Sequence, residues 1–586
     1  MSRPVRIANT SGFYGDRIDA VDEMLGGPDP IDVLTGDYLA ELTMLILWKA
    51  QRREPSRGWA ATFVSQMERN LGTCLDRGIK VVANAGGLDP HGCADALRGV
   101  ADGLGLDVRI AVVDGDDVLD RLRRLRHDGD PITNLDTGQP LDGAIEPVTA
   151  NAYLGGFGIA AGLEAGADVV VTPRVTDAAL AIGPAAWWHG WSPTDLDALA
   201  GAVVAGHVIE CGPQATGGNY CFADEELPDL RYPGFPIAEI EADGSSVITK
   251  QPGTGGAVTV GTVTAQLLYE LGGPSYLNPD VTARFDTIRL AQAAPDRVAI
   301  TDVKGDAPPE RLKVAINYPG GWRNSMGLVL TGLDADRKQR RAIAMLTELL
   351  GGWEQFDAHD IRRVGDELRV TVKSSDRARV GRSFSNRVTE LLLASYAGAY
   401  TTTPPTDATE YGVYWPAAID ADQVDHTVTL PDGTKEVVGR PVVPRPGPVP
   451  PRPATSPWPS EPTTVAPLGE VCGGRSGDKG GNANVGLWAR TDEGYRWLAS
   501  DLTVERFREL LPEAADLDVH RYELPNLRAL NFVVVGLLGE GVASSVRPDP
   551  QAKGLAEQVR AQEVPVPTRL LARPATGSET VGAPDG

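Results

Sequence analysis

The first half of the chain alternates short apolar runs with longer amphipathic stretches. The apolar runs are rich in Val, Ile or Ala and show little period-two alternation, as in strands that are buried on both faces of a sheet. They cover Val5–Ala8, Ile79–Ala83, Val108–Val113 and Asp168–Val171. Helical patterns lie between them, for example over Asp37–Arg53 and Pro90–Leu104. This βαβ order predicts a large N-terminal α/β domain with a parallel sheet and helices on both faces.

Each of the four apolar runs is followed directly by a polar segment. These segments are Asn9–Arg17, Asn84–His91, Asp114–Asp117 and Thr172–Asp177. In an open parallel sheet, ligands bind outside the carboxyl ends of the strands, where all four segments fall. Such loops are often polar without any function. Four of them that carry Asn, Asp and Arg nevertheless favour a ligand site at this edge.

A proline-dense segment, Arg440–Pro467, divides the chain into two parts. We therefore predict an N-terminal domain over residues 1–440, a proline-rich linker over 441–466 and a small domain over 467–568. The tail, residues 569–586, is rich in Gly, Pro, Ala and Ser, which predicts disorder.

The remaining elements are predicted from shorter patterns. In the middle of the chain, Leu368–Val372 has a strand pattern and Glu390–Ala399 a helical one. The small domain has strand-like and helical stretches that together suit a ferredoxin-like α+β fold. The strand-like ones are Asn484–Arg490, Val519–Leu524 and Ala529–Leu538, and the helical ones are Val504–Leu511 and Gln551–Ala561.

Composition narrows the function. The 586 residues carry a net charge of −24, which repels phosphate backbones and argues against nucleic-acid binding. The N-terminus has no apolar signal region, and the longest apolar run, Leu42–Trp48, is too short to span a bilayer. The five cysteines form no CxxC pair and the seven histidines no HExxH motif. We therefore expect a cytoplasmic protein that contacts no membrane and needs no metal or cofactor.

The densest polar chemistry lies in Arg475–Gly486, which holds two cations, one anion, two amides and four glycines. A phosphate-binding P-loop is disfavoured, because Asp478 separates Gly477 from Lys479 and a strand-like stretch follows. Two interpretations stay open. Arg475 and Lys479 bind a carboxylate or phosphate of the substrate, or Asp478 pairs with one of them in a structural loop.

Two acidic positions also attract attention. Asp37 and Glu41 are spaced i, i+4 at the start of a predicted helix, so both carboxylates would lie on one face. Two close acids can divide into a general acid and a general base, although acids are also common at helix N-termini through the helix dipole. Arg174 and Asp177 directly follow a predicted buried strand. Arg174 could hold a carboxylate or thioester oxygen, with Asp177 orienting it, or the two form a structural salt bridge.

Two further patterns are weak. Gly156 and Gly158 imitate part of a dinucleotide-binding fingerprint, but we expect no buried strand before them. His207 and Cys211 could form a catalytic pair. If His207–Cys211 is a strand, as its Val and Ile suggest, the two side chains are roughly 13 Å apart and the cysteine is inert.

Ten segments in this order resemble the acyclic terpene utilisation AtuA family. They are Gly12–Arg17, Thr35–Glu41, Asn84–Pro90, Asn151–Gly155, Gly166–Asp177, Gly206–Cys211, Gly217–Tyr220, Thr264–Glu270, Tyr414–Pro416 and Arg475–Gly480. One departure is Pro173, where the family pattern has Gly.

The resemblance implies a ferredoxin-like second domain and a role in the breakdown of branched acyl-CoA compounds, alongside biotin-dependent acyl-CoA carboxylases. It suggests a lyase or hydratase acting on a 3-hydroxy or unsaturated dicarboxylic acyl-CoA. The alternative is a non-catalytic binding or scaffold subunit of an acyl-CoA carboxylase. A homo-oligomer is expected.

The predicted site combines these patterns and leaves open which residue is the base. The catalytic candidates are Asp37, Glu41, Arg174 and Asp177. The substrate-binding candidates are Ser11, Gly12, Gly15, Asp16, Arg17, Asn84, Gly86, Gly87, Arg475, Ser476, Asp478, Lys479, Asn482 and Asn484.

Overall fold

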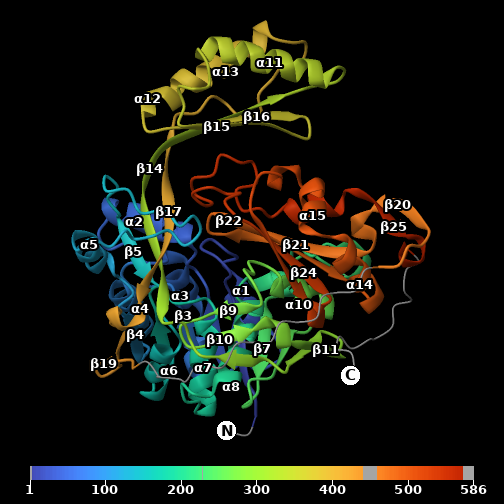
Figure 1. Ribbon diagram of the computed structural model, residues 1–586. Coiled ribbons are helices and arrows are strands. Elements are labelled where there is room, and N and C mark those ends of the chain that lie inside the picture. Colours follow the sequence, from blue (N-terminus) through green and yellow to red (C-terminus); the bar gives the residue numbers. More distant parts are fainter. Residues whose placement is uncertain (1–2, 228, 440–457, 572–586) are drawn as a thin grey trace.

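A large mixed sheet organises the N-terminal domain (Figure 1). The structure is a computed structural model that describes residues 3–227, 229–439 and 458–571. Five parallel strands form the centre of the sheet, in the order β1 (Val5–Asn9), β2 (Val33–Gly36), β3 (Lys80–Ala83), β6 (Val169–Val171) and β4 (Ile110–Asp114). The predicted parallel sheet is confirmed, and β2 is a strand that the sequence analysis missed.

Antiparallel strands extend the sheet on both sides. Next to β1 come β7 (Pro236–Ile240), β8 (Ser246–Lys250), β12 (Arg297–Thr301) and β11 (Arg289–Ala294). Next to β4 come β18 (Thr427–Thr429) and β19 (Lys435–Val437). A separate three-stranded sheet contains β9 (Ser275–Leu277), β10 (Thr282–Arg284) and β13 (Lys304–Asp306).

Both faces of the parallel strands are covered because their alternating residues belong to two different apolar cores. Ile7 and Val82 pack with one group of helices, and Ala8 and Val81 pack with another. The first group is α6 (Phe157–Glu164), α7 (Ala179–His189) and α8 (Leu196–Ile209). The second is α1 (Ala20–Gly26), α3 (Ala61–Asp76) and α4 (Pro90–Leu104). This two-sided burial explains the continuous Val, Ile and Ala runs in the sequence.

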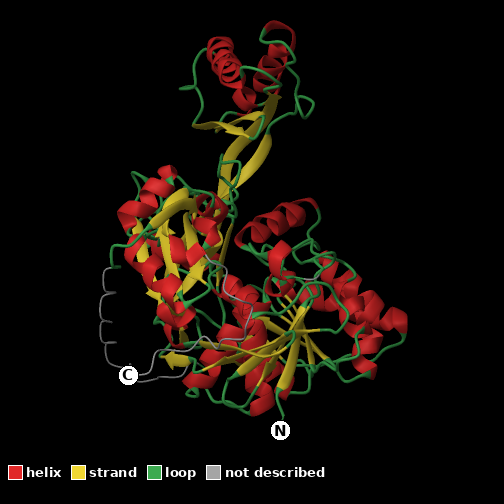
Figure 2. Cartoon of the chain, turned by 90° about the vertical axis from the view of Figure 1, so that its right-hand side faces the viewer, coloured by secondary structure: helices red, strands yellow, loops and turns green. Residues whose placement is uncertain are grey.

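Two long strands carry a module that stands out from the rest of the chain (Figures 1 and 2). They are β14 (Arg311–Val329) and β17 (Thr409–Asp420), and β5 (Thr149–Ala152) pairs with the first half of β14. The module adds β15 (Ala358–Val364), β16 (Glu367–Ser374), α11 (Ala335–Leu350), α12 (Arg377–Val380) and α13 (Arg382–Ala394). The predicted strand Leu368–Val372 lies within β16. The predicted helix Glu390–Ala399 is misplaced, because α13 ends at Ala394.

The C-terminal domain has the predicted ferredoxin-like arrangement. Its antiparallel sheet has the order β21 (Cys472–Lys479), β22 (Asn482–Ala489), β24 (Ala529–Val534) and β23 (Val519–Leu524). The helices are α14 (Asp492–Asp501), α15 (Val504–Leu510) and α16 (Leu555–Arg560). Val485 and Leu487 of β22 belong to the core that these helices share. Asn484 and Gly486 alternate with them and contact the N-terminal domain.

Some predicted boundaries differ from the structure. The Arg475–Gly486 motif is no loop: Arg475 to Lys479 end strand β21, and β22 begins at Asn482. Within the predicted linker 441–466, residues 441–457 lie outside the described residues, whereas β20 (Thr463–Pro467) pairs with β25 (Glu563–Pro567). Residues 572–586 of the predicted tail also lie outside the described residues.

The other described helices are short, except α2. They are α2 (Glu41–Arg53), α5 (Leu119–His127), α9 (Ala223–Glu226) and α10 (Val260–Leu267). Within the described residues, no helix combines the length and the apolarity needed to cross a membrane.

Candidate functional site

The polar segments after the five parallel strands are joined by hydrogen bonds. Asp37, which follows β2, donates its backbone N–H to the Ser11 carbonyl at 2.9 Å, beyond the end of β1. Its Oδ1 accepts from Asn84 Nδ2, beyond β3, at 2.6 Å. Arg174, beyond β6, donates its backbone N–H to Asp116 Oδ2, beyond β4, at 3.2 Å. The expected edge is therefore one connected polar surface.

Asp37 and Glu41 do not share a helix face as predicted. Helix α2 begins only at Glu41, where Thr43 Oγ1 accepts the backbone N–H of Ala40, and Asp37 lies in the preceding loop. The loop is anchored instead by Arg174, whose guanidinium donates to the Leu39 carbonyl between the two acids. The helix therefore begins four residues later than predicted, because Asp37 to Ala40 form a polar loop after β2.

Arg174 lies at the centre of the cluster. Its side chain is only 3 % exposed, its Nη2 lies 3.5 Å from Asp177 Oδ1, and its guanidinium carbon lies 4.4 Å from the centre of the Tyr153 ring. Burial alone would lower the pKa of this arginine, but the surrounding Tyr153, Asp177, Glu41 and Asp37 raise it well above its ordinary value. Arg174 therefore stays charged and compensates several acids at once.

A small cavity of about 10 Å³ adjoins Arg174's partner Asp177. Asp37, Asp177 and Glu210 all line it, and its volume is close to that of one water molecule. Burial, reinforced by the charge of Asp177, raises the pKa of both Asp37 and Glu210 well above the ordinary range. The surroundings of these two carboxyls therefore favour their protonated form.

Glu41 has the opposite character. Burial would raise its pKa, but the charges of Lys313 and Arg174 and a hydrogen bond from Tyr153 lower it to about 2. Lys313 Nζ lies 3.4 Å and the Tyr153 hydroxyl 3.0 Å from Glu41 Oε1. The side chains of Glu41 and Lys313 are 29 % and 36 % exposed although burial shifts both pKa values, as expected for groups that line a recess. Glu41 is thus a partly exposed carboxylate with a lowered pKa, and it shares the charge of Arg174 with Asp37, whose pKa is raised.

The pKa of Glu41 predicts a pH-dependent contribution to stability. Because the folded-state pKa of about 2 is below the ordinary 4.5, its contribution is present above pH 4.5 and lost as the pH falls through 2. Replacing Glu41 with Gln should lower the free energy of unfolding by roughly 3 kcal/mol at pH 7 and by much less near pH 2. Urea unfolding at both pH values measures this. Glu410→Gln, at a similarly exposed ion pair with Lys49, should change stability by less than about 1 kcal/mol.

The C-terminal domain reaches this cluster within the same chain. Lys479, the last residue of β21, places Nζ 5.2 Å from the centre of the Tyr276 ring. Burial and the neighbouring charge of Lys313 lower the pKa of Lys479, while Glu270, Glu41 and Glu210 act in the opposite direction. The two lysines therefore differ, since Lys313 has a raised pKa and stays charged.

Comparison with protein families identifies the chain. A family model described as acyclic terpene utilisation family protein AtuA matches residues 5–430, which is more than half of the sequence. The chain belongs to the AtuA family. A second model, described as the AtuA ferredoxin-like domain, matches residues 466–565, the part of the chain with the ferredoxin-like sheet. The family description connects the chain with acyclic terpene utilisation. A search of curated proteins and a search of solved structures returned no match.

In this AtuA-family chain, several predicted binding residues shape the loops and do not line the cavity. Gly12 packs so closely that a Cβ there would lie 2.8 Å from the backbone of Cys211, and its N–H donates to Asp16 Oδ2. Gly15 has φ +101°, and Arg17 pairs with Asp19 and Glu23. A Cβ on Gly86 would lie 2.6 Å from the Thr172 carbonyl, and Gly87 has φ +54°.

The predicted C-terminal residues divide in the same way. Lys479 joins the cluster. The pKa of Asp478 is raised mainly by burial and further by the charges of Glu270 and Glu41. Arg475 lies 4.2 Å from the centre of the Tyr269 ring and donates to Gln214. The other three hold the fold together. Ser476 bonds the Lys553 carbonyl, Asn482 bonds Asp136, and Asn484 bonds the Leu268 carbonyl.

The interpretation of His207–Cys211 as a strand is wrong. His207 lies in α8, where its Nδ1 is 3.1 Å from Glu210 Oε1, and it packs against the Tyr276 and Phe285 rings. Burial and then the charge of Lys479 lower the pKa of His207 to about 4, so it is neutral. Burial also raises the pKa of Cys211, which stays a thiol. Val208 and Ile209 were interpreted as part of a strand, but a fully buried helix accommodates these residues equally well.

The weak dinucleotide motif has a packing explanation. A buried strand, β5, does precede it, but β5 pairs with β14 and not with the parallel sheet. A Cβ on Gly158 would lie 2.5 Å from the His426 ring, so this glycine allows α6 to pack closely. The geometry is therefore unlike that of a dinucleotide fold.

Sequence reasoning missed several residues of the cluster. Tyr153, Glu210, Glu270 and Tyr414 lie inside segments that resemble the family, so these segments held a usable signal. Lys313 had none, because it is one polar residue within the long strand β14. Within the described part of the chain, no group of three or more His, Cys, Asp or Glu is arranged to hold a metal ion.

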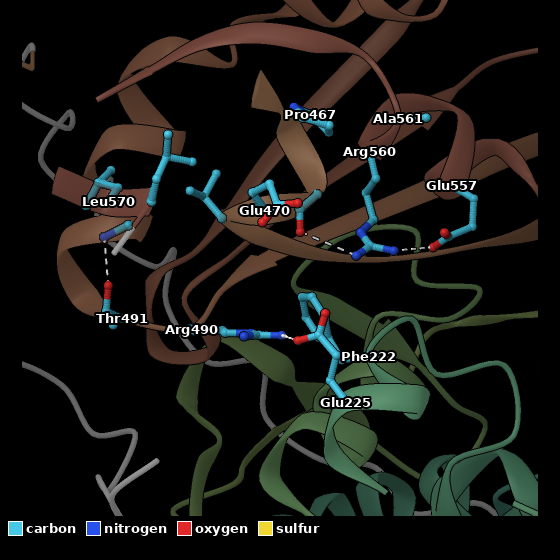
Figure 3. Close-up of a pocket in the computed structure, with 14 residues that line it drawn as sticks. Phe222, Glu225, Pro467, Glu470, Arg490, Thr491, Glu557, Arg560, Ala561 and Leu570 are labelled. Atoms are coloured by element: carbon cyan, nitrogen blue, oxygen red, sulfur yellow. Dashed lines mark hydrogen bonds and ion pairs between the residues drawn. The ribbon is translucent and has the colours of Figure 1, made fainter. Parts of the chain in front are cut away.

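A larger pocket lies elsewhere, between α9 and the C-terminal domain (Figure 3). Its volume is about 270 Å³, but both arginines that line it already form ion pairs with glutamates of the same chain. Arg490 pairs with Glu225 and Glu226, and Arg560 pairs with Glu557. This pocket shares no lining residue with the small cavity, and none of Asp37, Glu41, Asp177 and Glu210 lines it, so we place the candidate active site at the sheet edge.

Proposed function

We propose that the chain is a lyase or hydratase that acts on a 3-hydroxy or unsaturated dicarboxylic acyl-CoA in the catabolism of branched or terpenoid compounds. The observation that carries this proposal is the opposition between Glu41, whose pKa is about 2, and Asp37 and Glu210, whose pKa values are raised. Carboxyl groups whose surroundings separate their pKa values in this way are typical general base and general acid pairs.

The lyase reaction and the hydratase reaction both need a general base and a general acid. In a lyase, a base takes the proton of the 3-hydroxyl, the C2–C3 bond breaks, and its electron pair forms a thioester enolate that an acid protonates at C2. In a hydratase, a base takes the C2 proton and an acid protonates the departing hydroxyl, which leaves as water. Glu41 suits the base, Asp37 or Glu210 the acid, and a nearby cation stabilises the enolate oxygen.

The cations have separate roles in this proposal. Arg174 is almost fully buried and already bonded to Leu39 and Asp177, so we assign it the orientation of the acids and not direct binding of the substrate carboxylate. Lys313 and Lys479 are partly exposed, and their amines lie near the Tyr153 and Tyr276 rings, respectively. They are suited to bind the free carboxylate and the thioester oxygen.

The test is turnover of a panel of 3-hydroxy and unsaturated dicarboxylic acyl-CoA compounds, followed by mass spectrometry with and without divalent metals. Glu41→Gln should lower turnover by about 100-fold or more, because it removes the base, while Glu410→Gln should leave it unchanged. Absence of turnover across the panel would refute the proposal. Co-purification with acyl-CoA carboxylase subunits, with carboxylase activity indifferent to Glu41→Gln, would support a scaffold role instead.

A further inference from the structure

Two asparagines on one face of the C-terminal sheet form hydrogen bonds with one short segment of the N-terminal domain. Asn484 and Asn531 are fully buried neighbours on β22 and β24, and Asn484 Nδ2 donates to Asn531 Oδ1 at 2.9 Å. Asn484 Nδ2 also donates to the Leu268 carbonyl, and Asn531 Nδ2 to the Leu271 carbonyl, each at 2.7 Å. The two amides thus fix both ends of a four-residue segment that follows α10.

Glu270 lies inside that segment in a conformation that it would rarely adopt alone. Its φ is +54°, the left-handed region that favours glycine, Asn or Asp. Its backbone N–H donates to Asn484 Oδ1 at 2.9 Å, so the hydrogen bond from the other domain satisfies the turn. A left-handed glutamate held by a buried partner is typical of a position where the surroundings impose the geometry.

We infer that Glu270 is a further acid–base residue of the site and that Asn484 and Asn531 are positioning residues that hold its carboxyl toward Lys479. The catalytic part of this inference rests on the proposed function, whereas the positioning part does not. Docking of the C-terminal domain would then contribute to the site in two ways. It would supply Lys479, and it would fix the backbone conformation of Glu270.

The charges around these two groups agree with this placement. Burial and the charge of Glu41 raise the pKa of Glu270, with Asp177 adding to the effect, while Lys479 lowers it and Tyr269 bonds it. For Lys479, burial and Lys313 lower the pKa, and Glu270 is the first of the acids that raise it, before Glu41 and Glu210. Moving the Glu270 carboxyl away should therefore lower the pKa of Lys479 further.

The experiment measures this pKa without any substrate. The rate at which acetic anhydride acetylates Lys479 is followed by peptide mass spectrometry across a pH series in the full-length protein. Glu270→Gln should move the labelling midpoint to lower pH by roughly one unit, and Asn484→Ala should move it in the same direction. Asn526→Ala is the matched control: Asn526 also bonds across the domains, to Phe285 and Ile288, but does not touch the Glu270 segment.

The outcomes separate the two claims. The positioning claim fails if Asn484→Ala leaves the midpoint unchanged, if Asn526→Ala shifts it equally, or if Glu270→Gln has no effect. Should Asn484→Ala not fold, Asn531→Ala must give a shift in the same direction. If the panel shows turnover, Glu270→Gln should lower kcat at least tenfold, and Asn484→Ala should lower kcat more than it changes KM. A shifted midpoint without any turnover would support Asn484 and Asn531 as positioning residues and would refute the proposed function.

Discussion

Replacing Lys479 with Met should abolish turnover and leave the protein as stable as the wild type or more so. The amine lies where burial and Lys313 already disfavour its charged form, so an apolar side chain of similar length removes an unfavourable charge. If Lys479 binds the substrate or transfers a proton, its loss should reduce kcat/KM by about 100-fold or more. Steady-state kinetics and thermal unfolding of the same preparation measure the two effects.

Lys250, whose side chain is more deeply buried than that of Lys479, provides the control. The Lys250 side chain is 4 % exposed, bonds the Thr254 carbonyl and pairs with Asp296 far along the sheet from the cluster. Lys250→Met should therefore destabilise the fold and leave any kcat/KM of the folded protein unchanged. An active Lys479→Met variant would show that the C-terminal motif is structural, the second interpretation that the sequence left open.

The parallel core of the fold could be predicted because its strands are buried on both faces. The apolar runs Val5–Ala8 and Ile79–Ala83 show no alternation with polar residues, which would indicate surface strands. Both runs coincide with strands of the structure. Strand β2 was missed because only Val33 and Leu34 of its four residues are apolar, too few to form a recognisable apolar run. The antiparallel extensions and the long β14–β17 pair depend on pairing between distant segments, which local patterns do not encode.

The site could be predicted only in part, for a related reason. Residues that follow predicted parallel strands, such as Asn84 and Arg174, are placed at one edge by topology alone, whereas Asp37 was predicted at the start of a helix. Glu210, at the end of a helix, and Lys313, on a strand of another sheet, reach the same cluster through tertiary packing. The Arg475–Gly486 motif was recognised by its composition, but its role depends on the docking of a separate domain.

Removing Arg174 should have the largest effect on stability. Arg174→Met deletes the charge that lowers the pKa of both Asp37 and Glu41 and leaves buried acids uncompensated. Loss of one partner from a buried charge cluster typically costs about 3–5 kcal/mol. The variant should also be inactive, since the guanidinium holds the loop between Asp37 and Glu41 through the Leu39 carbonyl.

The pH dependence distinguishes this electrostatic role from simple packing. Without Arg174, the folded-state pKa of Glu41 rises from about 2, so the destabilisation should be small near pH 2 and grow as the pH rises above that value. Arg284→Met is the control, because Arg284 is also buried and paired with Asp286 and Asp306, outside the site. It should destabilise the fold without abolishing activity. A loss of stability in Arg174→Met that is the same at pH 2 and pH 7 would contradict the electrostatic role and would leave Arg174 with a packing function only.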